Sequence, residues 1–257
     1  MTEIPVVRIG DDAGIPILGF GTWQLRGRSA YDAVRWALDA GYRHIDTATM
    51  YKNEADVGKA IRDSGLDRGD LFITTKLPPG NAGREQSTIE DSLRALGTEY
   101  VDLWLVHWPP RRGKALEGVW RAFIGIRDGG LCRSIGVSNY STAEIDQLIA
   151  ATGETPAVNQ VPWSVRGHDQ KLLDEFRGRG VVVEGYSPLK NTRLTDPVLV
   201  QIAAAHDVTP AQVVLRWHVQ LGIVVIPRSS KHDRIVSNAD LFGFSLTDQE
   251  MDQLSSL

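Results

Sequence analysis

Short apolar runs alternate with longer amphipathic segments along the whole chain. Eight of these runs are about four to eight residues long and predict β-strands. They cover residues 17–22, 42–47, 71–76, 101–108, 134–138, 157–161, 181–186 and 223–226. Between and after them, apolar residues recur at helical spacing. The predicted helices cover residues 29–40, 53–64, 84–96, 114–128, 141–151, 168–178, 196–206, 209–221, 231–239 and 247–255.

This alternation predicts parallel strands joined by helical crossovers. Eight such units fit a closed α/β barrel, the (β/α)8 TIM barrel, better than an open sheet. Two runs, 6–9 and 15–18, flank the polar turn 11–14 and predict an N-terminal β-hairpin cap. The last two helices follow the last strand and are extra C-terminal helices. Since no linker or low-complexity tract interrupts the series, we expect a single domain over residues 1–257.

An open dinucleotide-binding sheet is the main alternative fold. Such a sheet carries the pattern G-x-G-x-x-G between its first strand and a helix. Gly19 and Gly21 match the first two glycines, but Gln24 stands at the third position and no helical pattern begins there. A tight turn is therefore the better interpretation of these glycines.

Polar residues and glycines mark the ends of several predicted helices. Side chains that can cap a helix N-terminus stand at Asn53, Ser141, Thr209 and Thr247. Glycines that can end a helix in the left-handed conformation stand at Gly41, Gly65, Gly97 and Gly180. These signals support the helix boundaries that the apolar pattern predicts.

Composition narrows the function classes. The net charge of −4 and the pI near 5.9 disfavour nucleic acid and anionic membranes as partners. Cys132 is the single cysteine, so no internal disulfide can form. The first residues do not resemble a secretory signal, and no apolar run reaches the roughly 20 residues of a membrane helix. We therefore expect a soluble cytoplasmic enzyme.

Four ionisable residues stand where three predicted strands end. Asp46 lies near the end of one predicted strand and Tyr51 follows it, Lys76 ends the next strand, and His107 lies at the end of the third. The active sites of TIM barrels lie at the carboxyl ends of their strands, so these side chains should share one face. Singly, each is more often a rim or packing residue. Jointly, they favour a catalytic site.

This combination suits the reduction of a carbonyl group. A free tyrosine has a pKa of about 10, and a nearby cation lowers it. Lys76 can supply that cation, with Asp46 as its counter-charge, and Tyr51 then acts as proton donor. His107 can bind the carbonyl oxygen. His44 could suggest a metal site, but no second cluster of ligands completes one, so we expect no metal.

Several sequence blocks resemble the aldo-keto reductase family. Residues 41–54, Gly-Tyr-Arg-His-Ile-Asp-Thr-Ala-Thr-Met-Tyr-Lys-Asn-Glu, are similar to the first signature of that family. Further blocks follow in the family's order at 74–76, 106–109, 135–139, 159–160, 186–189 and 226–229. The match covers nearly the whole chain, and the sequence is most similar to bacterial reductases of 2,5-diketogluconate and methylglyoxal. It implies that Asp46, Tyr51, Lys76 and His107 are catalytic.

The resemblance also implies NADPH as the cofactor, in a monomeric enzyme. It assigns the nicotinamide amide to Ser138, Asn139 and Gln160, and ring stacking to Tyr186. Ser187 and Leu189 would line the pyrophosphate path. The 2′-phosphate would lie at Arg228 and Ser229. The remaining cofactor positions are Thr22, Arg234 and Asn238. Ser237 replaces the family's usual glutamate, so the degree of preference for NADPH over NADH is left open.

The substrate side rests on aromatic and apolar loop residues. Trp23, Met50 and Trp108 follow predicted strands and can wall an apolar pocket, with Trp163 as a further candidate. Short loops after Trp108 and Leu189, and a chain that ends at Leu257, predict an open site for varied aldehydes and dicarbonyls with high KM.

Two other functions remain open from the sequence. A Schiff-base aldolase would use Lys76 as a neutral amine nucleophile, which the neighbouring Asp46 disfavours. A non-catalytic NADP-binding module would not need all four catalytic residues.

Overall fold

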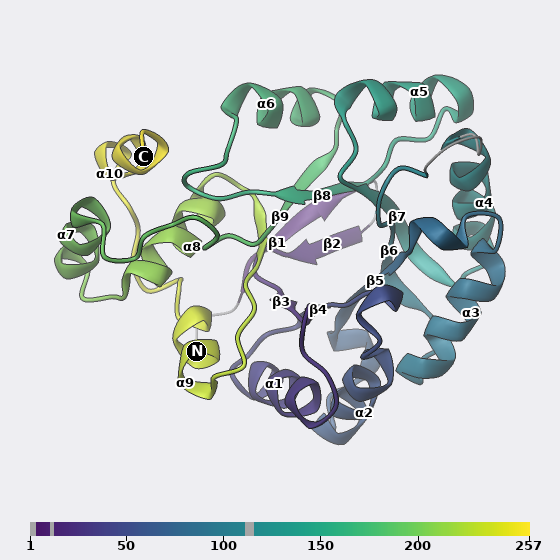
Figure 1. Ribbon diagram of the computed structural model, residues 1–257, viewed down its shortest axis with the longest axis horizontal. Helices are drawn as coiled ribbons and strands as arrows, with labels where there is room; N and C mark the ends of the chain where they lie inside the picture. Colours follow the sequence, from purple (N-terminus) through teal and green to yellow (C-terminus); the bar gives the residue numbers. More distant parts are fainter. Residues whose placement is uncertain (1–3, 11–12, 111–115) are drawn as a thin grey trace.

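The computed structural model describes residues 4–10, 13–110 and 116–257. Eight parallel strands form one sheet, surrounded by helices (Figure 1). The strands are β3 (Phe20–Gly21), β4 (His44–Asp46), β5 (Phe72–Leu77), β6 (Val101–Val106), β7 (Cys132–Ser138), β8 (Val158–Pro162), β9 (Val182–Tyr186) and β10 (Val224–Ile226). Each strand pairs with the next one in the chain, so the order in space follows the sequence.

The two ends of this sheet meet and close the barrel. Backbone hydrogen bonds run from Gly19 N to Val225 O (2.9 Å), from Val225 N to Ile17 O (2.9 Å) and from Gly21 N to Pro227 O (3.0 Å). Leu18 and Val225 form a parallel bridge at the same place. The predicted (β/α)8 barrel is therefore confirmed. Gly21 sits in this seam, where an added Cβ would lie 3.1 Å from the Ile226 carbonyl oxygen.

The helices occupy the positions that the apolar pattern predicts. They are α1 (Arg28–Asp39), α2 (Glu54–Ser64), α3 (Glu85–Leu96), α4 (Leu116–Asp128), α5 (Thr142–Thr152), α6 (Gln170–Gly178), α7 (Pro197–Ala205), α8 (Pro210–Gln220), α9 (His232–Ala239) and α10 (Asp248–Ser255). The first two residues of the predicted helix 114–128 lie outside the described residues. Among the described residues, no single helix is long and apolar enough to cross a membrane. Helices α7 and α8 meet the length and composition criteria only as a pair, and this pair is bent by 84°.

Three of the four predicted N-caps form as expected. The side chains of Ser141, Thr209 and Thr247 each accept a hydrogen bond from the backbone three residues on and form a reciprocal capping box. Asn53 precedes α2, but its side chain does not cap that helix. Its Oδ1, the atom that could cap the helix, accepts from the Thr47 hydroxyl at 2.8 Å, and its Nδ2 donates to the carbonyl oxygens of Thr22 and Leu25, both at 2.9 Å. Asn53 therefore precedes the start of α2 as predicted, but it makes no capping hydrogen bond because Thr47 occupies its side-chain oxygen.

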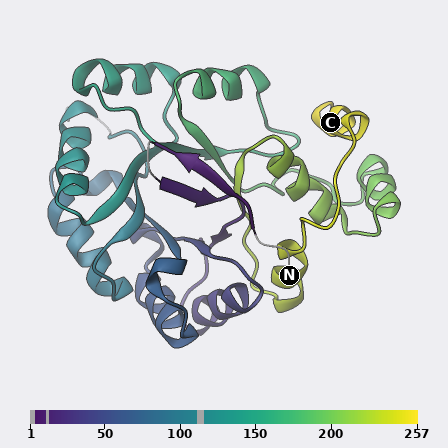
Figure 2. The same ribbon diagram turned by 180° about the vertical axis from the view of Figure 1, so that it is seen from behind.

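The N-terminal hairpin covers the amino-terminal end of the barrel (Figure 2). It consists of β1 (Val6–Ile9) and β2 (Ala13–Pro16), paired antiparallel with Val6 opposite Pro16. The second strand starts earlier than the predicted 15–18, and Gly14 belongs to it rather than to the turn. Two residues of the predicted turn, Asp11 and Asp12, lie outside the described residues. Ile9 and Ile15 of the hairpin are buried in one cluster with Phe72, Leu103, Leu105, Val158 and Val224 from the barrel.

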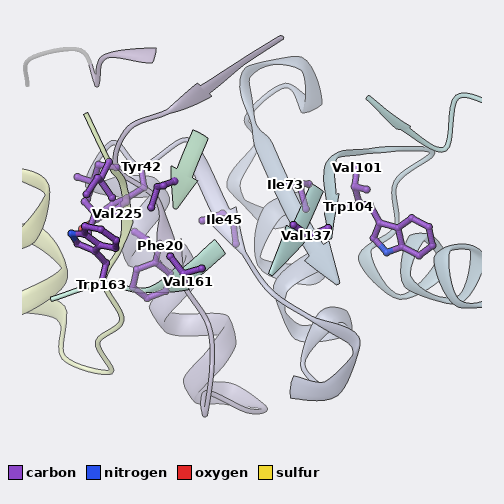
Figure 3. Close-up of a cluster of buried hydrophobic side chains, with 14 of the residues drawn as sticks. Phe20, Tyr42, Ile45, Ile73, Val101, Trp104, Val137, Val161, Trp163 and Val225 are labelled. Atoms are coloured by element: carbon purple, nitrogen blue, oxygen red, sulfur yellow. The ribbon is translucent and has the colours of Figure 1, made fainter. Parts of the chain in front are cut away.

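Outward-facing strand residues form the larger core between the sheet and the helices. Ile45, Ile73, Trp104, Val137 and Val161 are buried in this layer (Figure 3). Because side chains alternate along a strand, their neighbours point into the barrel. The inward positions change from apolar near the hairpin to polar at the other end, where the strands run out into loops. Folding therefore places the chemistry at one end.

Candidate active site

The carboxyl ends of β4, β5 and β6 bring the four predicted catalytic residues together. Asp46 ends β4, and Tyr51 ends a short 3₁₀ turn, Thr49–Tyr51. Lys76 points inward from β5, and His107 directly follows β6. Asp46, Tyr51 and His107 line a cavity of about 630 Å³, whereas Lys76 lies behind them and is fully buried.

Lys76 is held by three oxygen atoms. Its Nζ donates to both carboxylate oxygens of Asp46 at 2.7 Å and to the carbonyl oxygen of Thr47 at 2.8 Å. Burial alone would lower the pKa of Lys76, but the Asp46 charge reverses this and the pKa lies above its ordinary value. Lys76 is therefore an ammonium group at neutral pH.

Tyr51 lies beside this ion pair. Its hydroxyl oxygen is 3.5 Å from Lys76 Nζ, a long contact, and the ammonium lies 5.1 Å from the centre of the ring. The expected lowering of the Tyr51 pKa was wrong. Burial raises the pKa above 10, and the opposing effect of Lys76 is too small to reverse it. The phenol therefore keeps its proton at neutral pH.

His107 packs edge-on against Tyr51, with 5.7 Å between the ring centres. Burial and the nearby Lys76 lower its pKa to about 3, so the imidazole is neutral. Among the described residues, its Nδ1 atom has no hydrogen-bond partner. The ring is thus a neutral group that can donate one hydrogen bond, and the tautomer determines which of its two nitrogen atoms is the donor.

A polar wall lines the same cavity. It is built by Ser138, Asn139, Gln160 and Tyr186, all of which the resemblance assigns to the cofactor. The Tyr186 hydroxyl donates to Asn139 Oδ1 at 2.8 Å, and Asn139 Nδ2 donates to Ser138 Oγ at 2.9 Å. The side chains of this wall are therefore already ordered by one another.

Three non-glycine residues at the cavity have left-handed backbone conformations. The φ angles are 64° at Gln24, 64° at Asn139 and 55° at Ser187. Each residue follows a different strand and lines the cavity. Such conformations cost about 1 kcal/mol or more and cluster at binding sites, where the surrounding structure holds them in place.

Of the remaining predicted cofactor residues, some line the cavity and others do not. Arg228 lines the cavity, and its guanidinium donates to Gln24 Oε1 at 2.9 Å. Ser187 and Leu189 also line it. Thr22 does not, because its buried hydroxyl donates to the Asp46 carbonyl oxygen. The other three residues also lie outside the lining: buried Ser229 and Asn238, and exposed Arg234 on α9.

The mouth of the cavity is apolar. Trp23, Met50 and Trp108 line it, and each is about half exposed (53%, 52% and 46%). Large apolar side chains exposed together around one cavity indicate a binding surface. The assignment of Trp163 to this wall was wrong, because Trp163 is 2% exposed and packs below the rim.

Two features of the site were missed from the sequence. Gln24, Arg26 and Lys190 are loop residues at the cavity, and only their position in space reveals them. Glu184 is a fully buried carboxyl group inside the barrel. Its signal was present, since a glutamate in the apolar run 181–186 alternates with Val182 and Tyr186 and so shares their face.

Comparisons with known proteins point to one family. A family model described as the aldo/keto reductase family matches residues 17–257. The 2,5-diketo-D-gluconic acid reductase B of Corynebacterium sp. is 43% identical, over 100% of this chain and 94% of its own. The morphine 6-dehydrogenase of Pseudomonas putida is 40% identical, over 98% of this chain and 91% of its own.

Solved structures agree with this result. An aldo/keto reductase from Brucella melitensis has a TM-score of 0.97 at 41% identity, covering 100% of this chain and 98% of that one. A Bombyx mori aldo-keto reductase, solved in complex with NADP, has a TM-score of 0.94 at 31% identity, covering 100% and 93%. The family resemblance is confirmed, and with it the predicted enzyme class and cofactor. This chain belongs to the aldo/keto reductase family, a family of NADPH-dependent oxidoreductases.

Proposed function

We propose that this protein reduces aldehydes, ketones and α-dicarbonyls to alcohols with Tyr51 as the general acid. The observation that carries this proposal is the buried Asp46–Lys76 ion pair, with the Tyr51 hydroxyl 3.5 Å from the ammonium at the cavity wall. A protonated phenol and a fixed positive charge then stand together at the place where a carbonyl oxygen can enter.

The two properties of Tyr51 suit this role. Its raised pKa keeps the proton on the hydroxyl until it is needed. When that proton moves to the substrate oxygen, the ammonium of Lys76 stabilises the tyrosinate that remains. Asp46 keeps Lys76 charged throughout. Neutral His107, which packs edge-on against Tyr51, can donate a hydrogen bond to the same oxygen and orient the carbonyl.

The polar wall suits NADPH. When bound, NADPH supplies the hydride from its nicotinamide ring. Asn139 and Gln160 carry amide groups that can pair with the nicotinamide amide, and Tyr186 offers a flat ring at the cavity. Arg228, which also lines the cavity, offers a planar group for the 2′-phosphate. Ser229 and Arg234 are the neighbouring candidates in the same loop and helix.

The wide apolar mouth suits varied substrates. Trp23, Met50 and Trp108 offer flat and flexible apolar surface with few polar groups, so they select for apolar bulk rather than for one pattern of hydroxyls. We expect several small aldehydes and dicarbonyls to react with high KM. One sharply preferred substrate with a micromolar KM would contradict this part of the proposal.

The aldolase alternative is disfavoured by the state of Lys76. A Schiff base requires a neutral amine, whereas the pKa of Lys76 is raised and its Nζ is engaged by three oxygen atoms. Borohydride trapping with a carbonyl substrate should therefore leave no adduct on Lys76.

Tyr51→Phe tests the proposal directly. The change removes only the hydroxyl, so it should lower the rate of NADPH oxidation with methylglyoxal or an aromatic aldehyde by about 10²–10⁴-fold. The dissociation constant of NADPH, followed by the change in protein fluorescence, should stay within about threefold. A Tyr51→Phe variant with wild-type turnover would refute the acid role.

A further inference from the structure

A second carboxyl group lies inside the barrel beneath the catalytic residues. Glu184 points inward from β9 and is fully buried. Gln160, on the neighbouring strand β8, donates from one nitrogen atom, Nε2, to two acceptors: Asp46 Oδ2 at 2.8 Å and Glu184 Oε2 at 2.9 Å. The Gln160 amide therefore connects the two carboxyl groups, and both of its hydrogens are used.

The charges around Glu184 do not balance a second carboxylate. Lys76 is the ammonium of this cluster, and it is paired at 2.7 Å with Asp46. His44 Nε2 lies 3.6 Å from Glu184 Oε1, but burial and the nearby Lys76 lower the pKa of His44 to about 3, so the ring is neutral. Among the described residues, Glu184 Oε1 has no hydrogen-bond partner. The charge of Lys76 is therefore matched by Asp46 alone, and a second carboxylate at Glu184 would have no cation to pair with among the described residues.

We propose that Glu184 is a positioning residue of the reductase site: as a neutral carboxyl group it holds Gln160 against Asp46, and its ionisation makes Tyr51 a weaker acid. The inference rests on the proposed function for its effect on the rate. The neutral state of Glu184 rests on the geometry above. Consistently, burial and the charge of Asp46 raise the pKa of Glu184 to about 8.

The structure also shows what ionisation of Glu184 would change. The groups that face it are Asp46 and His44 from β4, Gln160 from β8 and, more distantly, Lys76 and Tyr51. A second carboxylate would place two negative charges on one amide nitrogen, against the single charge of Lys76. The negative charge of the tyrosinate would then be less well stabilised, which raises the Tyr51 pKa and slows proton donation.

Gln160 lines the cavity, as Asp46 does. Because Asp46 and Glu184 use both hydrogens of its amide, its carbonyl oxygen is the atom left to bind a ligand. That oxygen can accept a hydrogen bond from a primary amide such as the one on nicotinamide. Glu184 thus supports the orientation of a cofactor-binding side chain without touching the cofactor.

The test is the pH dependence of a single turnover. Hydride transfer from prebound NADPH to an aromatic aldehyde is followed by stopped flow between pH 6 and 9.5, with deuterated NADPH to establish that this step is observed. The wild-type rate should fall about 3–10-fold through an apparent pKa near 8. Glu184→Gln keeps an acceptor for Gln160 and cannot ionise. It should retain the rate at pH 6.5 within about threefold and lose the alkaline decrease.

Two comparisons separate positioning from simple stability. Glu54→Gln changes another buried glutamate, which bonds Thr75 outside the barrel interior, and it should leave the wild-type pH profile unchanged. Glu184→Leu removes the acceptor as well as the charge. It should lower the rate about 5–20-fold at every pH, because Gln160 loses one of its two restraints. Rescue by Gln but not by Leu supports the inference.

A second measurement does not depend on activity. Carbon-13 NMR of protein labelled at the glutamate carboxyl carbons should show one carboxyl that titrates near pH 8, and this signal should be missing in Glu184→Gln. An alkaline decrease that persists in Glu184→Gln, or a Glu184 that is already ionised at pH 6, would overturn the inference. Absence of NADPH-dependent turnover in the wild type would instead refute the proposed function, while the NMR titration would still establish the state of Glu184.

Discussion

Lys76 determines the electrostatics of the site at the scale of single residues. An ammonium group with no exposed surface is stable only because Asp46 and the Thr47 carbonyl oxygen surround it. Its charge then acts outward: it opposes the burial-driven rise in the Tyr51 pKa and helps to keep His107 neutral. The neutral state of His107 is compatible with a donor to a carbonyl oxygen over the whole physiological pH range.

Arg228 is the residue on which cofactor preference should depend. Arg228→Ala removes a planar cation at the cavity, so the dissociation constant of NADPH should rise about 10–100-fold. This loss corresponds to one or two charge-assisted hydrogen bonds. NADH, which lacks the 2′-phosphate, should bind within about threefold of the wild type. Fluorescence titrations with both cofactors measure this difference.

The matched control is Arg94→Ala, an exposed arginine on α3 outside the cavity, which should change neither constant. Equal losses for NADPH and NADH in Arg228→Ala would remove Arg228 from the 2′-phosphate site. They would instead implicate its hydrogen bond to Gln24, which joins the loops after β3 and β10.

At the scale of elements, the hairpin β1–β2 serves the barrel rather than the site. It covers the amino-terminal end, whereas the candidate catalytic residues lie at the carboxyl ends of the strands. Ile15→Ala opens a space in a fully buried cluster and should lower the free energy of unfolding by about 2–4 kcal/mol. Urea denaturation measures this loss, and the kcat of the folded enzyme should stay within about twofold.

Val6→Ala provides the comparison within the same hairpin. Val6 is 62% exposed and pairs through its backbone, so its truncation should cost less than about 0.5 kcal/mol. A strongly reduced kcat of Ile15→Ala, measured where the variant is fully folded, would mean that the hairpin influences the distant site. That outcome would contradict a purely structural role of the hairpin.

At the scale of the whole molecule, buried ionisable groups set the pH range of stability. The pKa of His44 falls from 6.5 to about 3 on folding. Below pH 6.5 the unfolded chain binds a proton at His44 that the folded protein does not bind, so stability falls as the pH drops below about 6.5. The pKa of Glu184 rises from 4.5 to about 8, so its contribution is complete below pH 4.5 and is lost as the pH rises towards 8.

Glu184→Gln should therefore gain stability relative to the wild type as the pH rises. We expect the difference in Tm between variant and wild type to shift in favour of the variant by about 3–8 °C from pH 5 to pH 9. Differential scanning fluorimetry at both pH values measures it. Glu90→Gln, on the exposed side of α3, should show no such shift. A constant difference would mean that Glu184 does not change its protonation on folding.

The sequence by itself determined the barrel, its hairpin and the four catalytic candidates. Strand and helix periods differ, so the apolar pattern predicts the order of the elements. A residue near the carboxyl end of a parallel strand then lies near one end of the barrel, whatever its neighbours are. Local signals such as Ser141 and Thr247 also determined helix starts, because a capping side chain bonds the backbone within its own turn. Asn53 shows the limit, because its side chain bonds Thr47 and a loop about 30 residues earlier in the chain instead of its own helix.

Only the tertiary structure decided the charges and the contacts across the barrel. Burial outweighs Lys76 at Tyr51, and no local pattern reports how deeply a side chain lies. Gln24 meets Arg228 because the sheet closes on itself, so residues more than 200 positions apart in the sequence become neighbours. Glu184 and Asp46 share one Gln160 nitrogen for the same reason. Protonation states depend on these distances, and the distances exist only once the barrel has closed.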